Sequence, residues 1–194
     1  MRKQAFITTL LVLSCLSLSG CLTSLWTGAS LVYDRHGVYK KISDFQLGAN
    51  ASRELYKDAQ FKGGNTMIDL ATFNGDILLA GHVPTQALRE EAQARIARQP
   101  GSRRIFNQLS VGPAVDSSVE DSWITTKIRS GILADADISP DQFKIVTTDR
   151  IVYIMGDVIP AQATKVIYIA RNCTGVRRVV KLLKYYNLSD KPAN

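Results

Sequence analysis

Cysteine and histidine are scarce in this sequence. Its 194 residues include three cysteines and two histidines, His36 and His82. Neither histidine has cysteine or carboxylate neighbours at metal-ligand spacing, and the sequence contains no Gly-x-Ser-x-Gly, Walker or Gly-x-Gly-x-x-Gly motif. We therefore expect a protein that is not an enzyme and that holds no metal or other cofactor. We interpret His82 as a solvated loop residue at the end of a strand.

A calcium-binding loop is suggested by three aspartates and excluded by two other residues. Asp135, Asp137 and Asp141 stand at the first, third and seventh positions of such a loop. The sixth position requires glycine and the twelfth requires glutamate, but this sequence has Pro140 and Val146 there. We interpret the segment as a turn that ends a helix.

Acidic residues are absent from the first 20 positions, which have the composition of a secretion signal. Arg2 and Lys3 precede an uncharged, mostly apolar run at 5–18, which is shorter than the roughly 20 apolar residues that span a bilayer. The tetrapeptide Leu-Ser-Gly-Cys at 18–21 follows at once. This pattern predicts a lipoprotein signal peptide at 1–20 and acylation of Cys21. The alternative is an ordinary signal peptide with a chance cysteine.

The residue after the acylated cysteine is Leu22. An aspartate at that position commonly retains Gram-negative lipoproteins at the inner membrane, so its absence favours the outer membrane. Two or three acyl chains are enough to anchor a protein stably. We expect a protein anchored in the outer membrane by its lipid and facing the periplasm.

The composition that remains after cleavage is basic and almost free of thiols. Removal of residues 1–20 takes away two basic residues and no acidic residue, so the formal net charge changes from +7 to +5. A basic surface favours an anionic partner. Outside the cytoplasm, we expect anionic phospholipid or lipopolysaccharide and no nucleic acid. Cys173 is the one unmodified thiol left, which excludes an intramolecular disulfide, and we interpret it as a small packing residue.

Most of the chain consists of an internal repeat. The segment Ile68–Val83 resembles Phe143–Val158 at an offset of 75 residues, and Gly101–Val111 resembles Gly175–Tyr185 at an offset of 74. A loop can absorb the difference of one residue. Two copies predict two small domains of about 70 residues each.

Each copy has the pattern helix, strand, strand, helix, strand. Asn74-Gly75 is a preferred two-residue hairpin turn, Thr85 can cap the helix that follows, and Ser117–Glu120 has the form of a capping box. The connection between the second and third strands is long enough for a crossover. This predicts an α+β fold in which each domain is a three-stranded mixed sheet with two helices on one face. The predicted strands are Met67–Phe73, Asp76–Val83, Arg104–Val111, Phe143–Thr148, Arg150–Val158 and Arg178–Tyr185.

The domain boundaries follow from these elements. The first domain opens with a helix at about Asp44–Tyr56, which is weak because Gly48 and Asn50 lie inside it. The predicted divisions are a signal peptide at 1–20, an acylated N-terminus and tether at 21–43, domains at 44–112 and 117–187, and a C-terminal tail at 188–194.

The helix that opens the second domain has more apolar residues than are needed to pack against the core of its own domain. Ile124 and Ile128 fall on its core stripe, while Trp123 and Lys127 lie together on one flank. A membrane-surface helix needs an interfacial aromatic residue, apolar residues and cations. Trp123, Ile124, Ile128 and Leu133 can supply the first two, and Lys127 and Arg129 the third, so these six are the candidates for the lipid binding that the resemblance below implies.

At this helix the chain resembles the dual BON-domain outer-membrane lipoproteins (the DolP/YraP type). The segment Asp121–Ser130, DSWITTKIRS, is similar to the D-x-W-I-T-T-K-V-R-S segment of that family. Further marks of the resemblance are the strand-end glycines Gly81 and Gly156, and Gly175-Val176 followed by Arg-Arg-Val. The resemblance covers nearly all of residues 44–186. It implies a repeated αββαβ fold, a role in envelope integrity and binding of anionic phospholipid through the first helix of the second domain.

Two other interpretations of the same residues remain open. Trp123 can pack between the two domains, with Lys127 and Arg129 as plain solvated surface. The protein as a whole can be a periplasmic protein-binding adaptor or a chaperone-like subunit of an envelope assembly or secretion machine. The candidate partners are therefore an anionic phospholipid membrane and, as the alternative, envelope assembly proteins.

Overall fold

The computed structural model describes residues 35–113 and 117–186. The predicted signal peptide, Cys21, most of the predicted tether and the tail at 188–194 lie outside these residues. Among the described residues, no helix has both the length and the apolar composition needed to cross a membrane.

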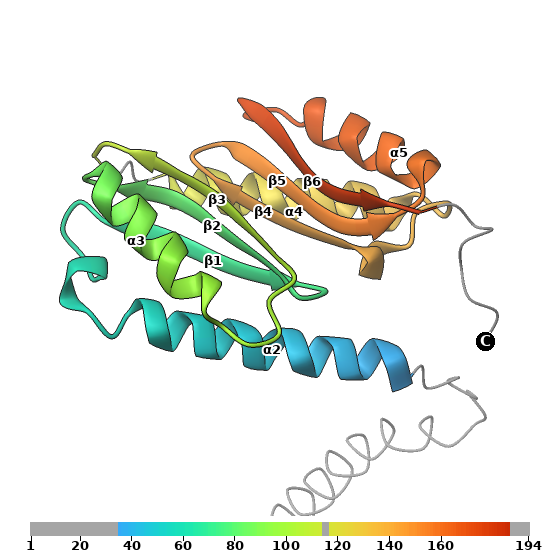
Figure 1. The fold of residues 1–194 in the computed structure, drawn as a ribbon. Coiled ribbons are helices and arrows are strands. Elements are labelled where there is room, and N and C mark those ends of the chain that lie inside the picture. Colours follow the sequence, from blue (N-terminus) through green and yellow to red (C-terminus); the bar gives the residue numbers. More distant parts are fainter. Residues whose placement is uncertain (1–34, 114–116, 187–194) are drawn as a thin grey trace, which may run out of the picture. The chain divides into compact units, whose positions relative to one another are not determined.

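The first domain contains two helices and three strands in the predicted order (Figure 1). Helix α2 carries the core residues Leu47, Ala51 and Leu55 at a spacing of four, and these pack with Ile68 of the sheet. The elements are α2 (Arg35–Leu55), a 3₁₀ turn (Ala59–Phe61), β1 (Met67–Phe73), β2 (Asp76–Val83), α3 (Gln86–Ala97) and β3 (Arg104–Val111).

The second domain repeats the same order (Figure 1). Ile124, Ile128 and Ile132 form the buried stripe of its first helix, as the periodicity predicts. Cys173 packs against this core as well. The elements are α4 (Ser118–Ala134), a 3₁₀ turn (Pro140–Gln142), β4 (Phe143–Thr148), β5 (Ile151–Val158), α5 (Pro160–Arg171) and β6 (Arg178–Tyr185).

Each domain has one mixed sheet of three strands, in the orders β1-β2-β3 and β4-β5-β6. The first two strands of each sheet are antiparallel hairpin partners. The third strand pairs parallel to the middle one after the crossover through α3 or α5. The predicted α+β fold with two αββαβ units is confirmed.

The middle strand of each sheet is buried on both faces. In β2, Ile77 and Leu79 join the core beneath the helices, whereas Leu78 and Ala80 point to the opposite face. The same alternation in β5 points Val152 and Ile154 toward the helices. Their neighbours Ile151, Tyr153 and Met155 point to the opposite face of the sheet. A third apolar cluster therefore lies between the two sheets. Its buried members are Leu78, Ala80, Ile151, Tyr153, Met155 and Leu182.

Helix α2 begins at Arg35, nine residues before the predicted start at Asp44, so part of the predicted tether is helical. The glycine that weakens this helix in isolation has a packing role. A Cβ at Gly48 would lie 3.1 Å from Thr72 Oγ1, and that hydroxyl donates a hydrogen bond of 2.9 Å to the carbonyl oxygen of Asp44. Gly48 thus lets the helix approach β1 closely.

A carboxylate on the first helix fastens the hairpin turn in each domain. Asp44 accepts hydrogen bonds of 2.7 and 2.8 Å from the backbone N–H groups of Asn74 and Gly75. Asp121 accepts bonds of 2.8 and 2.7 Å from those of Asp149 and Arg150. Both turns have positive φ at their two central residues, which is the geometry that Asn-Gly predicts for the first turn.

The predicted capping box at Ser117 is wrong, although Thr85 caps α3 as expected by accepting a bond of 3.2 Å from Leu88 N–H. Ser117 precedes α4 but caps no backbone group. Its hydroxyl donates instead to Asp121 Oδ2 at 2.6 Å, because that buried carboxylate offers a stronger, charged acceptor.

Candidate functional site

Helix α4 has one fully buried face and one exposed face that carries three large apolar side chains among polar ones. Its inner stripe is closed to solvent, with Ile124 1% exposed and Ile128 0% exposed. On the outer side Val119, Trp123 and Leu133 are 79%, 47% and 71% exposed. These three are among only seven large hydrophobic side chains that are exposed in the described part of the chain. The helix therefore presents more apolar surface than its own core contact uses.

Trp123 and Lys127 form a pair on this outer face. Their spacing of four places them one turn apart, and Lys127 Nζ lies 4.5 Å from the centre of the Trp123 ring. Trp123 is 47% exposed, so about half of its surface is open to a ligand, and the interpretation that it packs between the domains stays a prediction. The pair combines an amphipathic ring with a cation, as an interfacial anchor requires.

Arg129 and Leu133 complete the exposed part of the predicted set. Arg129 is exposed, and its guanidinium donates a hydrogen bond of 3.1 Å to the carbonyl oxygen of Ile145. That bond directs Arg129 toward strand β4, away from the Trp123–Lys127 pair, and leaves part of its donor set for another ligand.

Two residues of the predicted lipid-binding set lie elsewhere. Ile124 and Ile128 are members of the second domain's core and have almost no exposed surface. A ligand on the outside of α4 cannot reach them while the domain stays folded. The sequence places Ile124 and Ile128 on the core stripe, and the predicted lipid-binding residues include them as well. Their burial confirms the core position and shows that the lipid-binding assignment is wrong.

The far end of α4 borders a groove of about 750 Å³ between α4 and α5. Gly131 and Ala134 line it from α4, and Lys165 and Tyr168 line it from α5. Lys165 is already paired, because its Nζ lies 3.0 Å from Asp135 Oδ1 and 2.6 Å from Asp137 Oδ2. The bond from Lys165 lowers the pKa of Asp135. The groove thus offers an apolar surface and no unpaired cation among its lining residues.

The contacts of Lys165 agree with the turn predicted after α4, because Asp135 and Asp137 of that turn accept hydrogen bonds from its ammonium group. Among the described residues, no group of three or more histidine, cysteine, aspartate or glutamate side chains is arranged to hold a metal ion.

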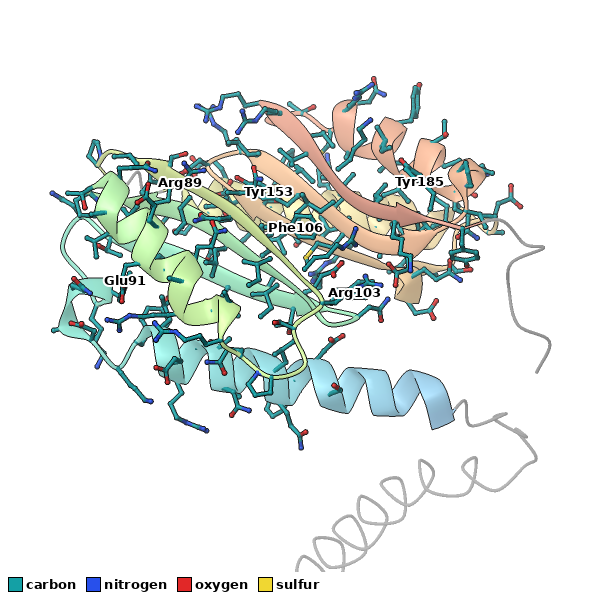
Figure 2. The ribbon with its side chains drawn as sticks, viewed as in Figure 1. Arg89, Glu91, Arg103, Phe106, Tyr153 and Tyr185 are labelled. Carbon is teal, nitrogen blue, oxygen red and sulfur yellow. The ribbon has the colours of Figure 1, made fainter. Side chains whose placement is uncertain are left out.

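An ionic cluster joins the two sheets at the start of β3. Asp76 is 2% exposed and accepts hydrogen bonds of 2.8 Å from Arg103 and 2.5 Å from Arg104. Arg103, which is labelled in Figure 2, also pairs with Asp157 of the second domain at 2.8 Å. Burial by itself would raise the pKa of Asp76, but the hydrogen bonds and charges of the two arginines outweigh it and lower that pKa.

His82 takes part in a second contact between the domains. Its Nε2 pairs with Asp149 Oδ2, and the two side chains are 13% and 11% exposed. The interpretation of His82 as a solvated loop residue is therefore wrong, because its partner comes from the other copy of the repeat. No pattern within one copy signals this pairing.

The sequence model of the BON domain family matches this chain twice, over residues 43–113 and 120–187. The two matched ranges coincide closely with the two αββαβ units.

Several curated relatives are similar to most of the chain. A 21 kDa hemolysin of Actinobacillus pleuropneumoniae is 34% identical over 75% of this chain and 75% of its own length. The outer membrane lipoprotein DolP of Haemophilus influenzae is 28% identical over 87% of this chain and 90% of its own. The osmotically inducible protein Y of Escherichia coli is 31% identical over 62% of each chain.

Proposed function

Because the chain belongs to the BON domain family, with a DolP among its relatives, we propose that this envelope-associated protein is a non-enzymatic outer-membrane lipoprotein that binds anionic phospholipid. Acyl chains on Cys21 hold it to the membrane, facing the periplasm, and the outer face of α4 makes a second, reversible contact. In this role it supports the integrity of the envelope.

The observation that carries the proposal is the exposed face of α4. Trp123 lies under the Lys127 ammonium at 4.5 Å, and Val119 and Leu133 are exposed on the same helix. An indole ring favours the headgroup region of a bilayer, apolar side chains enter the acyl boundary, and a cation beside them attracts phosphate. Arg129 adds a second cation on the β4 side of the helix.

The two membrane contacts reinforce each other. A chain already anchored at Cys21 meets the bilayer at a high effective concentration, so a weak contact through α4 suffices to keep the second domain on the surface. The proposed α4 contact therefore needs only a modest affinity of its own.

Vesicle flotation tests the proposal with the Cys21→Ser chain, which carries no acyl group. We expect it to float with phosphatidylcholine vesicles that contain phosphatidylglycerol and to stay behind with phosphatidylcholine alone. The double substitution Trp123→Ala and Lys127→Glu should abolish flotation. Phe45→Ala is the matched control, because Phe45 is an aromatic side chain that is 78% exposed on α2 of the first domain. Unchanged flotation of the double variant would show that the assigned face is wrong.

The protein-binding adaptor is the competing function for the same surface. A photo-crosslinker at position 123 separates the two in intact cells. Lipid binding predicts adducts with lipid and no discrete protein band, whereas an adaptor gives discrete protein adducts.

A further inference from the structure

The two repeats differ in the charges at equivalent positions beside the hairpin turn. In the first domain, Arg103 precedes β3 and Arg104 starts it, and both are neutralised by Asp76 and Asp157. In the second domain, Arg177 precedes β6 and Arg178 starts it. By strand register, Arg104 lies opposite Asp76, whereas Arg178 lies opposite Ile151. The second copy has therefore kept the arginine pair and replaced the buried aspartate with isoleucine.

A third arginine stands on the turn itself. The first turn is Asn74-Gly75, with φ of 50° and 79°, and the second is Asp149-Arg150, with φ of 54° and 59°. Glycine adopts this left-handed conformation freely, while arginine adopts it at a cost in backbone strain. Residues held in this strained conformation cluster at binding and catalytic sites.

The backbone places these arginines side by side. Arg177 N–H donates to the Arg150 carbonyl oxygen at 2.8 Å, as Arg103 N–H donates to Gly75 at 2.7 Å. In the first domain a Cβ added to Gly75 would lie 3.4 Å from Arg103 Cβ. Arg150 and Arg177 occupy the equivalent positions of the second domain and are joined by the same backbone hydrogen bond, which makes them neighbours.

No carboxylate in the described part of the chain forms an ion pair with Arg150, Arg177 or Arg178, and all three are exposed. The two carboxylates closest in the fold are engaged elsewhere. Asp121 accepts the turn's backbone N–H groups and the Ser117 hydroxyl, and Asp149 pairs with His82. Arg178 interacts with the Tyr153 hydroxyl, whose pKa is raised by burial against the opposing effect of Arg178 and Arg177. Three exposed cations that form no ion pair among the described residues attract an anion.

We propose that Arg150, Arg177 and Arg178 form a phosphate-binding site at the β4–β5 turn of the second domain. Planar guanidinium groups bind phosphate oxygens in pairs, which is the recognition that adjacent arginines supply best. The turn is fastened to the buried Asp121 in the first turn of α4, so the site lies at the N-terminal end of the helix that carries Trp123. The claim that the phosphate belongs to a lipid headgroup rests on the proposed function. The claim that the site binds phosphate stands without it.

The test uses the Cys21→Ser chain and two probes, inorganic phosphate and vesicles that contain phosphatidylglycerol. Titration with inorganic phosphate, against chloride at equal ionic strength, should shift the amide resonances of residues 149–151 and 176–178. Arg150→Gly combined with Arg177→Gln should abolish these shifts. The same double variant should bind the vesicles less tightly, by about fivefold for each charge removed.

Two controls isolate the site. Arg103→Gln removes an equivalent arginine that already has carboxylate partners, and Lys62→Gln removes an exposed cation of the first domain. Each should change vesicle binding less than twofold. Arg150→Gly alone should not lower the melting temperature, because it restores the residue that the first turn has and relieves the left-handed strain.

The outcomes separate this site from the α4 contact. Shifts with inorganic phosphate and weaker vesicle binding support a headgroup site. Shifts without any change in vesicle binding support a phosphate site whose natural ligand is a free phosphate group. Absence of shifts, with vesicle binding lost in the Trp123→Ala variant but kept in the arginine variant, would overturn the phosphate site and leave the proposed function intact.

Discussion

Single side chains on α4 divide into those that hold the fold and those that face outward. Ile128 and Trp123 are five residues apart, yet the first is 0% exposed and the second is 47% exposed. Ile128→Ala should therefore lower stability, whereas Trp123→Ala should weaken lipid binding and leave stability nearly unchanged.

Ile128→Ala should lower the free energy of unfolding by about 2–4 kcal/mol, because it removes buried methyl groups and leaves a cavity. Trp123→Ala should lower it by less than about 1 kcal/mol, since it loses only a half-exposed ring and one cation–π contact. Urea denaturation followed by circular dichroism measures both. A loss of 2 kcal/mol or more in the Trp123 variant would mean that the ring is structural.

Asp76 makes stability depend on pH. Its pKa in the folded protein lies below the ordinary value of 3.8. Between those two pKa values the unfolded chain binds more protons than the folded one, so stability rises with pH across this window. The contribution is fully present above about pH 4 and is lost as the pH falls through the folded-state pKa.

Asp76→Asn should lower the free energy of unfolding at pH 7 by about 2–4 kcal/mol, because it leaves two arginines without their buried carboxylate. The variant should also show a flatter decline in stability as the pH falls below about 4, measured by urea denaturation. Asp141→Asn, at an exposed carboxylate, serves as the control and should match the parent curve.

At the scale of elements, one carboxylate links the first helix of each domain to its hairpin. Asp121 accepts two backbone N–H groups and the Ser117 hydroxyl, and Asp44 accepts the two equivalent N–H groups. The helix and the β-hairpin of a domain are thus joined by hydrogen bonds as well as by apolar packing.

Asp121→Asn should cost about 1–3 kcal/mol, because one of the two acceptor oxygens is replaced by a donor that faces another donor. Hydrogen exchange at the amides of Asp149 and Arg150 should accelerate more than exchange in the middle of β5. Asp44→Asn provides the internal comparison and should accelerate exchange at Asn74 and Gly75 only. Exchange that rises equally in both turns would point to a global loss of stability.

At the scale of the whole described molecule, the two sheets share a core. Tyr153 and Met155 of β5 pack with Leu78 of β2, and Phe106 of β3 is partly buried beside them (Phe106 and Tyr153 are labelled in Figure 2). Thr148 Oγ1 of the second domain also donates to Asp69 Oδ2 of the first at 2.8 Å. The described residues from 36 to 113 and from 117 to 186 accordingly belong to one compact unit.

We expect the two domains to unfold in one cooperative transition, because neither can expose its sheet face independently without losing that shared core. Met155→Glu places an unpaired charge in the shared core and leaves the helix-side core intact. It should split the calorimetric trace into two transitions or lower the single melting temperature sharply. Two transitions in the unsubstituted protein would contradict the coupling.

Periodicity and turn chemistry were enough to predict the elements of each domain. The hairpin at Asn74-Gly75, the cap at Thr85 and the buried stripe of α4 all depend on residues close in sequence, whose geometry the backbone sets locally. The internal repeat supplied the number of domains. The early start of α2 was missed because its packing on β1 outweighs the low helix propensity of Gly48.

The ionic and apolar contacts between the copies were invisible in the sequence. His82 with Asp149 and Arg103 with Asp157 are more than fifty residues apart, and no local pattern pairs them. The sequence by itself determined the family, the repeated αββαβ order and which face of α4 is apolar. Only the tertiary structure decided that Ile124 and Ile128 are closed to a ligand and that the arginines of the first repeat are neutralised while those of the second are not. Burial and ion pairing arise when distant segments meet, and a linear pattern does not record which segments do.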